Sequence, residues 1–326
     1  MDSIWIFAEQ SNGEVHPSFY ELLSKARELF PQAKLTAVVF GGDNAHAVDV
    51  LQASGVDSIL NAAHEKLVDY RPDCYAKALI RLASAEKPDV ILTAATEIGS
   101  ELAPTVAAAL GTGLAAHCAD ICLGDNGEVI TLIPAFGGKL MGEILIPTAR
   151  PFMATVKPGV FEKHTLEPSA EVKMIQADTS FLDDFQSGIK LLGVEATEHH
   201  AASIETAEVV VCAGLGISSK ENWDKANELA RRLKGSICYT RPVVDMGYTD
   251  TEDAMVGTSG KMIRPKLYIG FGVSGASHHV CGMKDSGTII SVNTNEKAEI
   301  FNVSDYKFVG DSGVVLDELL KSLGQI

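Results

Sequence analysis

Short apolar runs alternate with stretches of helical periodicity from the first residues to about residue 190. Within Cys74–Glu86, for example, apolar residues recur at the spacing of one helix face. Such alternation is typical of βαβ units, in which helices cover a parallel sheet. The predicted elements are the strands Ile4–Ala8, Leu35–Phe40, Ser58–Asn61 and Val90–Ala95, and the helices Phe19–Phe30, Ala45–Ser54, Cys74–Glu86 and Leu102–Leu110.

The pattern changes twice before the chain's last third. From Ile121 to Thr155, short runs flank Asp125-Asn126-Gly127 and Gly137-Gly138, which predicts a hairpin-like, partly antiparallel extension of the sheet. Between about residues 161 and 207, apolar density falls and the chain is expected to be irregular. We therefore expect an N-terminal α/β domain over residues 1–196 and a second domain over residues 197–326.

Alternation resumes after Glu208, and it predicts a Rossmann-like, doubly wound α/β domain. Its expected strands are Val209–Ala213, Ser236–Tyr239, Leu267–Phe271 and Thr288–Val292, and its expected helices are Trp223–Leu233 and Val314–Leu323.

Composition narrows the function classes. A formal net charge of −16 argues against binding of nucleic acid, which requires clustered Lys and Arg. Apolar runs are too short to insert into a membrane, and the N-terminus resembles no export signal, so a cytoplasmic location is expected. The six cysteines include no CxxC pair, which predicts reduced thiols and neither a metal site nor an iron–sulfur cluster.

Glycine turns follow two strands of the second domain. Gly214-Leu215-Gly216 could expose backbone amides to an anion, although a tight strand-to-helix turn explains the pattern equally well. In LYIGFGVSGASHH, residues 267–279, Gly272 and Gly275 flank Ser274 at a strand end, which favours close approach of a phosphate. His278 and His279 follow, either beside the ligand or as ordinary packing residues.

Other polar residues end neighbouring strands or glycine-flanked segments. A residue before proline is biased toward extended backbone, which projects Arg241 from a strand end, unless it is simply a solvated loop residue. Together these groups outline a groove for a nucleotide cofactor at the carboxyl edge of the sheet. They are Thr240, Arg241, Thr258, Ser259, Asn293 and Asp311.

These segments, in this order, resemble the flavin domain of electron-transfer flavoprotein alpha subunits. The resemblance rests on GLGISSKENW (214–223), TRPVVD (240–245), VGTSGK (256–261), the stretch Leu267–Asn293 and IFNVSDYKFVGD (300–311). GTGLAAHCADI (111–121) and RPFMATVKPGVF (150–161) extend it over nearly the whole chain.

The resemblance implies FAD as the cofactor. It implies that Ser274 and Gly275 hold the pyrophosphate, with Thr240 a further donor, and that Asn293 and Asp311 contact the adenosine end. It also implies roles at the flavin ring, where a cation and a donor would raise the reduction potential. Arg241 would lie over the ring, Ser259 near N5 and His279 at the N1/C2 carbonyl edge.

The chain departs from the family pattern at the ring. His278 stands where Gln is usual, and Thr258-Ser259 stands where many members have Gln-Thr. Because His278 can titrate where Gln cannot, we expect the tuning of the flavin to differ here.

The resemblance implies a heterodimeric electron carrier that pairs with a beta subunit. Its electrons would pass between a flavin dehydrogenase, such as an acyl-CoA dehydrogenase, and a downstream acceptor, with or without NADH-dependent bifurcation. Two alternatives stay open on the residues alone: an FAD- or NAD-dependent oxidoreductase with its own substrate, and an adenine-nucleotide sensor.

Overall fold

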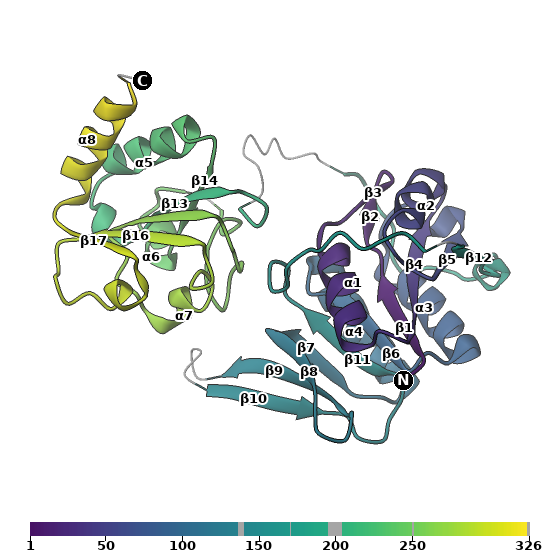
Figure 1. The fold of residues 1–326 in the computed structure, drawn as a ribbon. Helices are drawn as coiled ribbons and strands as arrows, with labels where there is room; N and C mark the ends of the chain where they lie inside the picture. Colours follow the sequence, from purple (N-terminus) through teal and green to yellow (C-terminus); the bar gives the residue numbers. More distant parts are fainter. Residues whose placement is uncertain (136–139, 170, 195–203, 250, 325–326) are drawn as a thin grey trace. The chain divides into compact units, whose positions relative to one another are not determined.

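The computed structural model describes residues 1–135, 140–169, 171–194, 204–249 and 251–324. The chain forms two compact units (Figure 1). The first unit comprises Met1–Ile133 and Met141–Ala196, and the second comprises Pro134–Leu140 and Thr197–Ile326. Each unit is described by itself.

The first unit is built on a seven-stranded sheet whose neighbouring strands run parallel. The chain starts with β1 in the middle of the sheet and adds β4 and β5 on one side of it. The next strand, β6, is added on the other side of β1, so the strand order reverses between β1 and β6. Across the sheet, the strands are β12 (Lys173–Gln176), β5 (Ser58–Ala63), β4 (Lys34–Gly41), β1 (Ser3–Phe7), β6 (Val90–Ala94), β11 (Phe152–Val156) and β7 (Leu114–Cys118).

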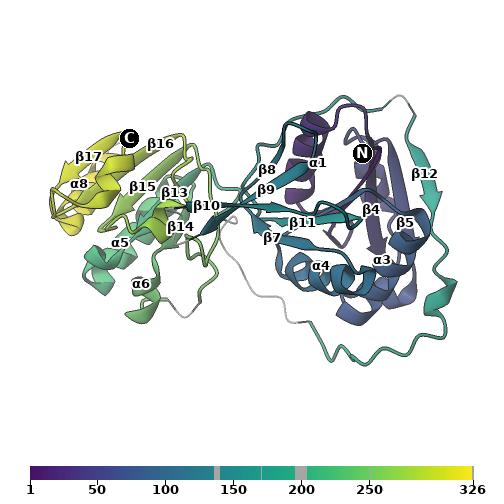
Figure 2. The same ribbon diagram turned by 90° about the horizontal axis from the view of Figure 1, so that it is seen from below.

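Helices cover this sheet because its strands are apolar on both faces. In β1, all residues from Ile4 to Phe7 are buried. Trp5 and Phe7 pack in one core cluster with the buried faces of α3 (Pro72–Glu86) and α4 (Glu97–Leu110). The helices α1 (Ser18–Leu29) and α2 (Ala45–Gln52) complete the unit, and each has a buried face of its own. Figure 2 shows α1 on one side of the sheet and α3 and α4 on the other.

A three-stranded sheet, in the order β10–β9–β8, extends the first unit. The strands β8 (Asp120–Leu123) and β9 (Val129–Ala135) pair antiparallel around the predicted Asp125-Asn126-Gly127 turn, so that hairpin is confirmed. The strand β10 (Leu140–Leu145) follows, and the Gly137-Gly138 turn lies outside the described residues.

Two strand assignments from the sequence are wrong. Phe152–Thr155 was expected in the antiparallel extension, but β11 runs parallel between β6 and β7 and is fully buried. The region expected to be irregular contributes β12, which pairs with β5 along Lys173–Gln176. Both errors have one cause: strand pairing over a long sequence separation leaves no local periodicity to detect.

The second unit contains a five-stranded parallel sheet, so the predicted α/β class is confirmed for both units. Numbered in chain order, its strands lie 2-1-3-4-5, which is the flavodoxin-like variant of the doubly wound sheet. Across the sheet they are β14 (Ser236–Tyr239), β13 (Val209–Ala213), β15 (Leu267–Phe271), β16 (Thr288–Asn293) and β17 (Tyr306–Val309).

Both faces of this second sheet carry a core. On one face, α5 (Lys220–Arg232) and α8 (Ser312–Leu323) lie side by side and pack on Val211, Ile269 and Phe271 (Figure 1). On the other, Val210, Cys212 and Tyr268 pack beneath irregular segments, the short helix α7 (Ser277–Val280) and the 3-10 helix η5 (Glu299–Val303).

Candidate functional site

The strand order of the second unit reverses between β13 and β15, where a crevice at the carboxyl ends is the usual ligand site of an open α/β sheet. Two glycine turns meet there. A Cβ at Gly214 would lie 2.4 Å from the Gly272 carbonyl oxygen, and one at Gly272 would lie 2.3 Å from the Gly216 carbonyl carbon. Glycine is therefore required at these positions so that the two backbones can approach each other.

The first of these turns does not present free amides. Gly214 N donates to Phe271 O and Gly216 N donates to Gly272 O, each at 2.9 Å, while Ile217 N donates to Gly214 O. An anion at Gly214–Gly216 would therefore find these three donors already used. The alternative interpretation, a tight strand-to-helix turn, agrees with the structure.

The second turn is open. Within the described part of the chain, the backbone amides of Ser274, Gly275, Ala276 and Ser277 donate no hydrogen bond. Gly275 has φ +90°, and a Cβ there would lie 1.9 Å from Ile300 N, so only glycine fits between this turn and η5. An uninterrupted run of unpaired amides beside a glycine is a cradle for phosphate oxygens.

A hollow of ≈360 Å³ lies beside this turn, lined by Ser274, Asn293 and Lys297 among others. The Asn293 amide donates to Val273 O at 2.8 Å, and its oxygen accepts from Asn295 N at 2.9 Å, so this side chain joins the two strand ends. Sequence reasoning did not select Lys297, because a lysine in an irregular segment carries no motif.

Asp311 has a structural task in this chain. Its carboxylate accepts from the backbone amides of Gly313 and Val314 at 2.8 and 3.2 Å, which caps the N-terminus of α8. The preceding Gly310 N donates to Asn293 O, so the predicted adenosine contacts do lie on adjoining strand ends. The predicted contact of Asp311 itself with a nucleotide stays a prediction.

The segment expected near the flavin ring brings Thr258 and His278 together. Thr258 Oγ1 and His278 Nδ1 lie 2.9 Å apart, and Thr258 N donates to His278 O at 2.9 Å. Ser259 is exposed beside them. Arg241 begins α6 (Arg241–Asp245) directly after Thr240, which follows β14, and its exposed guanidinium lies 3.8 Å from the Glu252 carboxylate.

His279 does not face a ligand groove in this structure. Only 5% of the residue is exposed, its Nδ1 lies 3.0 Å from Val256 O, and its Nε2 lies 2.8 Å from the Tyr268 hydroxyl. Both ring nitrogens therefore have protein partners. The packing alternative agrees with this arrangement, and a contact between His279 and a flavin carbonyl stays a prediction that would require the ring to exchange a partner.

The arrangement fits a dinucleotide with a diphosphate. The unpaired amides of Ser274–Ser277 and the obligatory Gly275 lie where the strand order reverses, at the carboxyl ends of the strands. Lys297 and Arg241 offer positive charge along the same sheet edge. The match to known protein families identifies the dinucleotide that binds here. The electron transfer flavoprotein domain matches residues 4–180, and the electron transfer flavoprotein FAD-binding domain matches residues 203–284. The chain belongs to the electron transfer flavoprotein alpha subunit family.

Relatives of this alpha subunit match it along nearly its whole length. Protein FixB of Clostridium saccharobutylicum is 38% identical, covering 99% of this chain and 96% of that protein. The electron transfer flavoprotein subunit alpha of Thermoanaerobacterium thermosaccharolyticum is 37% identical, with 99% and 98% covered. Subunit LctC of the lactate dehydrogenase (NAD(+),ferredoxin) of Acetobacterium woodii is 33% identical, with 97% and 76% covered.

FAD is therefore the cofactor of this alpha subunit, as predicted. Across the described residues, no group of three or more His, Cys, Asp or Glu side chains is placed to hold a metal ion. In that same part of the chain, no helix is both long and apolar enough to cross a membrane.

Proposed function

We propose that this alpha subunit is the FAD-carrying half of a heterodimeric electron carrier, and that it passes electrons between a flavin dehydrogenase and a downstream acceptor. The open turn Ser274–Ser277, with unpaired amides beside Gly275, is the observation that carries this proposal. FAD supplies the redox chemistry when it is bound. The protein's own groups supply binding, orientation and charge.

In this proposal the phosphate cradle holds the diphosphate by backbone donors, and Lys297 adds positive charge beside it. Asn293 stiffens the strand ends against which the adenosine end would lie. At the other end of the cofactor, Arg241 favours negative charge on the ring system. The Thr258–His278 pair and exposed Ser259 offer hydrogen-bonding groups nearby.

The first experiment is reconstitution of the apoprotein with FAD, followed by a redox titration. Arg241→Ala should lower the midpoint potential of the flavin, because the cation that favours the reduced anion is lost. Arg241→Lys keeps the charge and serves as the matched control. A titration curve of Arg241→Ala that overlays that of the parent protein would contradict the proposed role.

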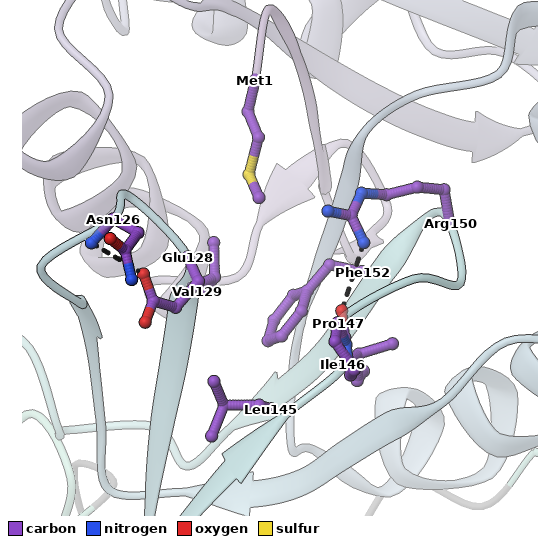
Figure 3. A pocket seen from close by; sticks show the side chains of 9 residues that line it. All are labelled: Met1, Asn126, Glu128, Val129, Leu145, Ile146, Pro147, Arg150 and Phe152. Atoms are coloured by element: carbon purple, nitrogen blue, oxygen red, sulfur yellow. Dashed lines mark hydrogen bonds between the residues drawn. The ribbon is translucent and has the colours of Figure 1, made fainter.

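The first unit offers a surface for the beta subunit. Exposed apolar side chains lie on the small sheet, where Leu123, Met141 and Leu145 are each more than a third exposed, and Met141 and Leu145 share one face of β10. A largely apolar hollow of ≈290 Å³ adjoins them, lined by Val129, Leu145, Ile146, Pro147 and Phe152, with Arg150 and Glu128 also on its wall (Figure 3). Clustered exposed apolar side chains are typical of a protein interface.

A charge substitution tests this surface. Leu145→Lys should weaken binding of the beta subunit at least about tenfold, since Leu145 is exposed beside the hollow and a lysine there would be desolvated in the interface. Val68→Lys is the matched control, because Val68 is a 59% exposed apolar residue of the same unit on a different segment. If both variants bind the beta subunit like the parent, the interface lies elsewhere.

The carrier can either shuttle electrons or take part in bifurcation. Two relatives are named as parts of larger redox enzymes: LctC of the lactate dehydrogenase (NAD(+),ferredoxin), and the acryloyl-CoA reductase electron transfer subunit beta of Anaerotignum propionicum. We favour bifurcation on this ground. Two FAD per heterodimer would agree with it, whereas one FAD together with AMP would indicate a simple shuttle between an acyl-CoA dehydrogenase and its acceptor. The cytoplasmic location stays a prediction that cell fractionation would test.

A further inference from the structure

Two buried cysteines lie side by side in the second unit. Cys212 of β13 and Cys238 of β14 are register partners on neighbouring parallel strands, and both are 0% exposed. Register partners point to the same face of a sheet, and both side chains pack in the same core cluster. Both thiols are free in this structure.

The spacing of the two strands is compatible with a disulfide. Neighbouring strands lie about 4.7–4.9 Å apart, which falls within the roughly 4.4–6.8 Å between Cα atoms that a disulfide spans. The strand β14 is the edge strand of its sheet, and each cysteine is the penultimate residue of its strand. The pair therefore lies near the carboxyl rim rather than deep within the sheet.

A histidine and a tyrosine complete the cluster. His279 Nε2 lies 3.8 Å from Cys212 Sγ and 2.8 Å from the Tyr268 hydroxyl. Because Val256 O can only accept, His279 Nδ1 carries a proton and Nε2 is left to exchange a proton with Cys212 or Tyr268. The thiol of Cys212 thus has an adjacent proton acceptor.

Electrostatics distinguishes the two sulfurs. Burial by itself would raise the pKa of Cys212, but the hydrogen bond from the Cys238 thiol and the nearby His279 ring outweigh it and lower that pKa. Burial, together with the neighbouring Cys212 sulfur, raises the pKa of Cys238. Cys212 is accordingly the nucleophile of the pair, and Cys238 is the thiol that can resolve an oxidised Cys212.

We propose that Cys212 and Cys238 are an oxidisable dithiol that hydrogen peroxide converts to a disulfide, with His279 activating Cys212. A small oxidant is required because the cluster is buried, so a bulky disulfide such as oxidised glutathione has no access to it. Nothing in this proposal depends on bound FAD.

The chemistry balances in two steps. The Cys212 sulfur attacks one peroxide oxygen, an S–O bond forms, the O–O bond breaks, and the departing hydroxide takes the proton that Cys212 gave to His279. The Cys238 sulfur then attacks the Cys212 sulfur, an S–S bond forms, the S–O bond breaks, and hydroxide leaves with the Cys238 proton. Two thiols and one peroxide thus give one disulfide and two waters.

The test is graded oxidation of the intact apoprotein with hydrogen peroxide, followed by alkylation under denaturing conditions and peptide mapping. The expected product is a linked peptide pair containing Cys212 and Cys238, with a mass loss of two hydrogen atoms. In Cys238→Ser, the oxidised Cys212 should instead be trapped as a dimedone adduct when dimedone is present during denaturation, because the folded protein buries Cys212. The proposal is overturned if both residues remain alkylatable thiols while the partly exposed Cys122 and Cys281 oxidise.

His279 is tested separately. His279→Gln should slow disulfide formation about tenfold or more, since the buried Cys212 thiol then has no imidazole to take its proton, and each unit by which its pKa exceeds the pH lowers the thiolate fraction about tenfold. Tyr268→Phe is the matched control: it removes a competing hydroxyl from Nε2, keeps the ring, and should not slow the reaction. Circular dichroism establishes that each variant is folded, and Cys238→Ala replaces Cys238→Ser if the latter is not. Equal rates in parent and His279→Gln would overturn the activation by His279.

Discussion

Single glycines decide where the open turn Ser274–Ser277 can form. Gly275 combines a positive φ with a backbone neighbour, Ile300 N, that leaves no room for a Cβ. Gly247 has a similarly positive φ of +69° but nothing within 4 Å of a Cβ. A substitution at Gly247 therefore measures the cost of the left-handed conformation alone, whereas one at Gly275 measures that cost plus the overlap of a Cβ with Ile300 N.

We predict that Gly275→Ala lowers the free energy of unfolding by more than about 2 kcal/mol and abolishes FAD binding. The left-handed conformation alone costs roughly 1–2 kcal/mol, and the overlap with Ile300 N adds to it. Gly247→Ala should lower the free energy of unfolding only by the cost of the left-handed conformation, and the variant should bind FAD normally. Urea unfolding and FAD titration measure both quantities. Equal losses in the two variants would show that the cradle is not specifically required.

Substitutions of Asp311 can distinguish its role as the N-cap of α8 from its predicted contact with FAD. Replacing Asp311 with Ala should lower the free energy of unfolding by about 1 kcal/mol, because α8 loses the acceptor for two of its first amides. Asp311→Asn retains a capping oxygen and should unfold like the parent. If Asp311 also contacts the nucleotide through its charge, Asp311→Asn will bind FAD more weakly despite normal stability, as thermal melts and FAD titrations would show.

Among the elements, those with local signals were predicted well. Leu267–Phe271 was predicted to the residue because an apolar run is bounded by Lys266 and Gly272. The sequence predicts α4 from Leu102, but the helix begins at Glu97, where Thr96 Oγ1 accepts a hydrogen bond from Gly99 N and caps it. The prediction misses this start because the first turn lacks the apolar periodicity of the rest of the helix. Local sequence patterns therefore locate an element more reliably than its first turn.

Within the site, residue types were easier to predict than their partners. The glycine turn after β15 followed from glycine spacing and a strand end, both local features, while its binding of phosphate stays a prediction. The burial of His279 did not, since it depends on Tyr268 and Val256, residues brought to it only by the fold. The same holds for β11, whose parallel neighbours β6 and β7 lie elsewhere in the sequence.

One carboxylate attaches an irregular segment to a helix of the first unit. Asp73, in the first turn of α3, accepts from Ser187 Oγ and Gly188 N, each at 2.8 Å. Burial acts to raise the pKa of Asp73, but these hydrogen bonds outweigh it and lower that pKa. Because the folded-state pKa is depressed, this stabilisation is complete above the unfolded value of about 3.9 and is lost as pH falls through the folded pKa.

We therefore predict that, as pH falls, residues around Ser187 and Gly188 lose protection from hydrogen exchange before the rest of the first unit does, when each rate is compared with the intrinsic rate at that pH. Asp73→Asn should show lower protection of this segment already at neutral pH and little further loss of protection below pH ~4. Asp184→Asn is the control, because Asp184 is an exposed acid of the same segment. A protection factor of this segment that does not change with pH in the parent protein would refute the attachment by Asp73.

At the scale of the whole molecule, each unit has its own core and its own tryptophan. The chain contains two tryptophans: Trp5 is buried in the first unit, and Trp223 is buried in the second, where it packs edge-to-face on Tyr239. Single-tryptophan variants, Trp5→Phe and Trp223→Phe, thus report on one unit each. FAD binds the second unit, so its free energy of binding should stabilise that unit specifically.

The expected result is a selective shift. At FAD a hundredfold above its dissociation constant, unfolding reported by Trp223 should become about 2.7 kcal/mol less favourable, while unfolding reported by Trp5 should not change. Urea titrations of the two variants with and without FAD measure this, and far-UV circular dichroism corrects for quenching by the flavin. A shift of equal size at both tryptophans would mean that the units unfold as one cooperative body, which two separate cores do not by themselves require.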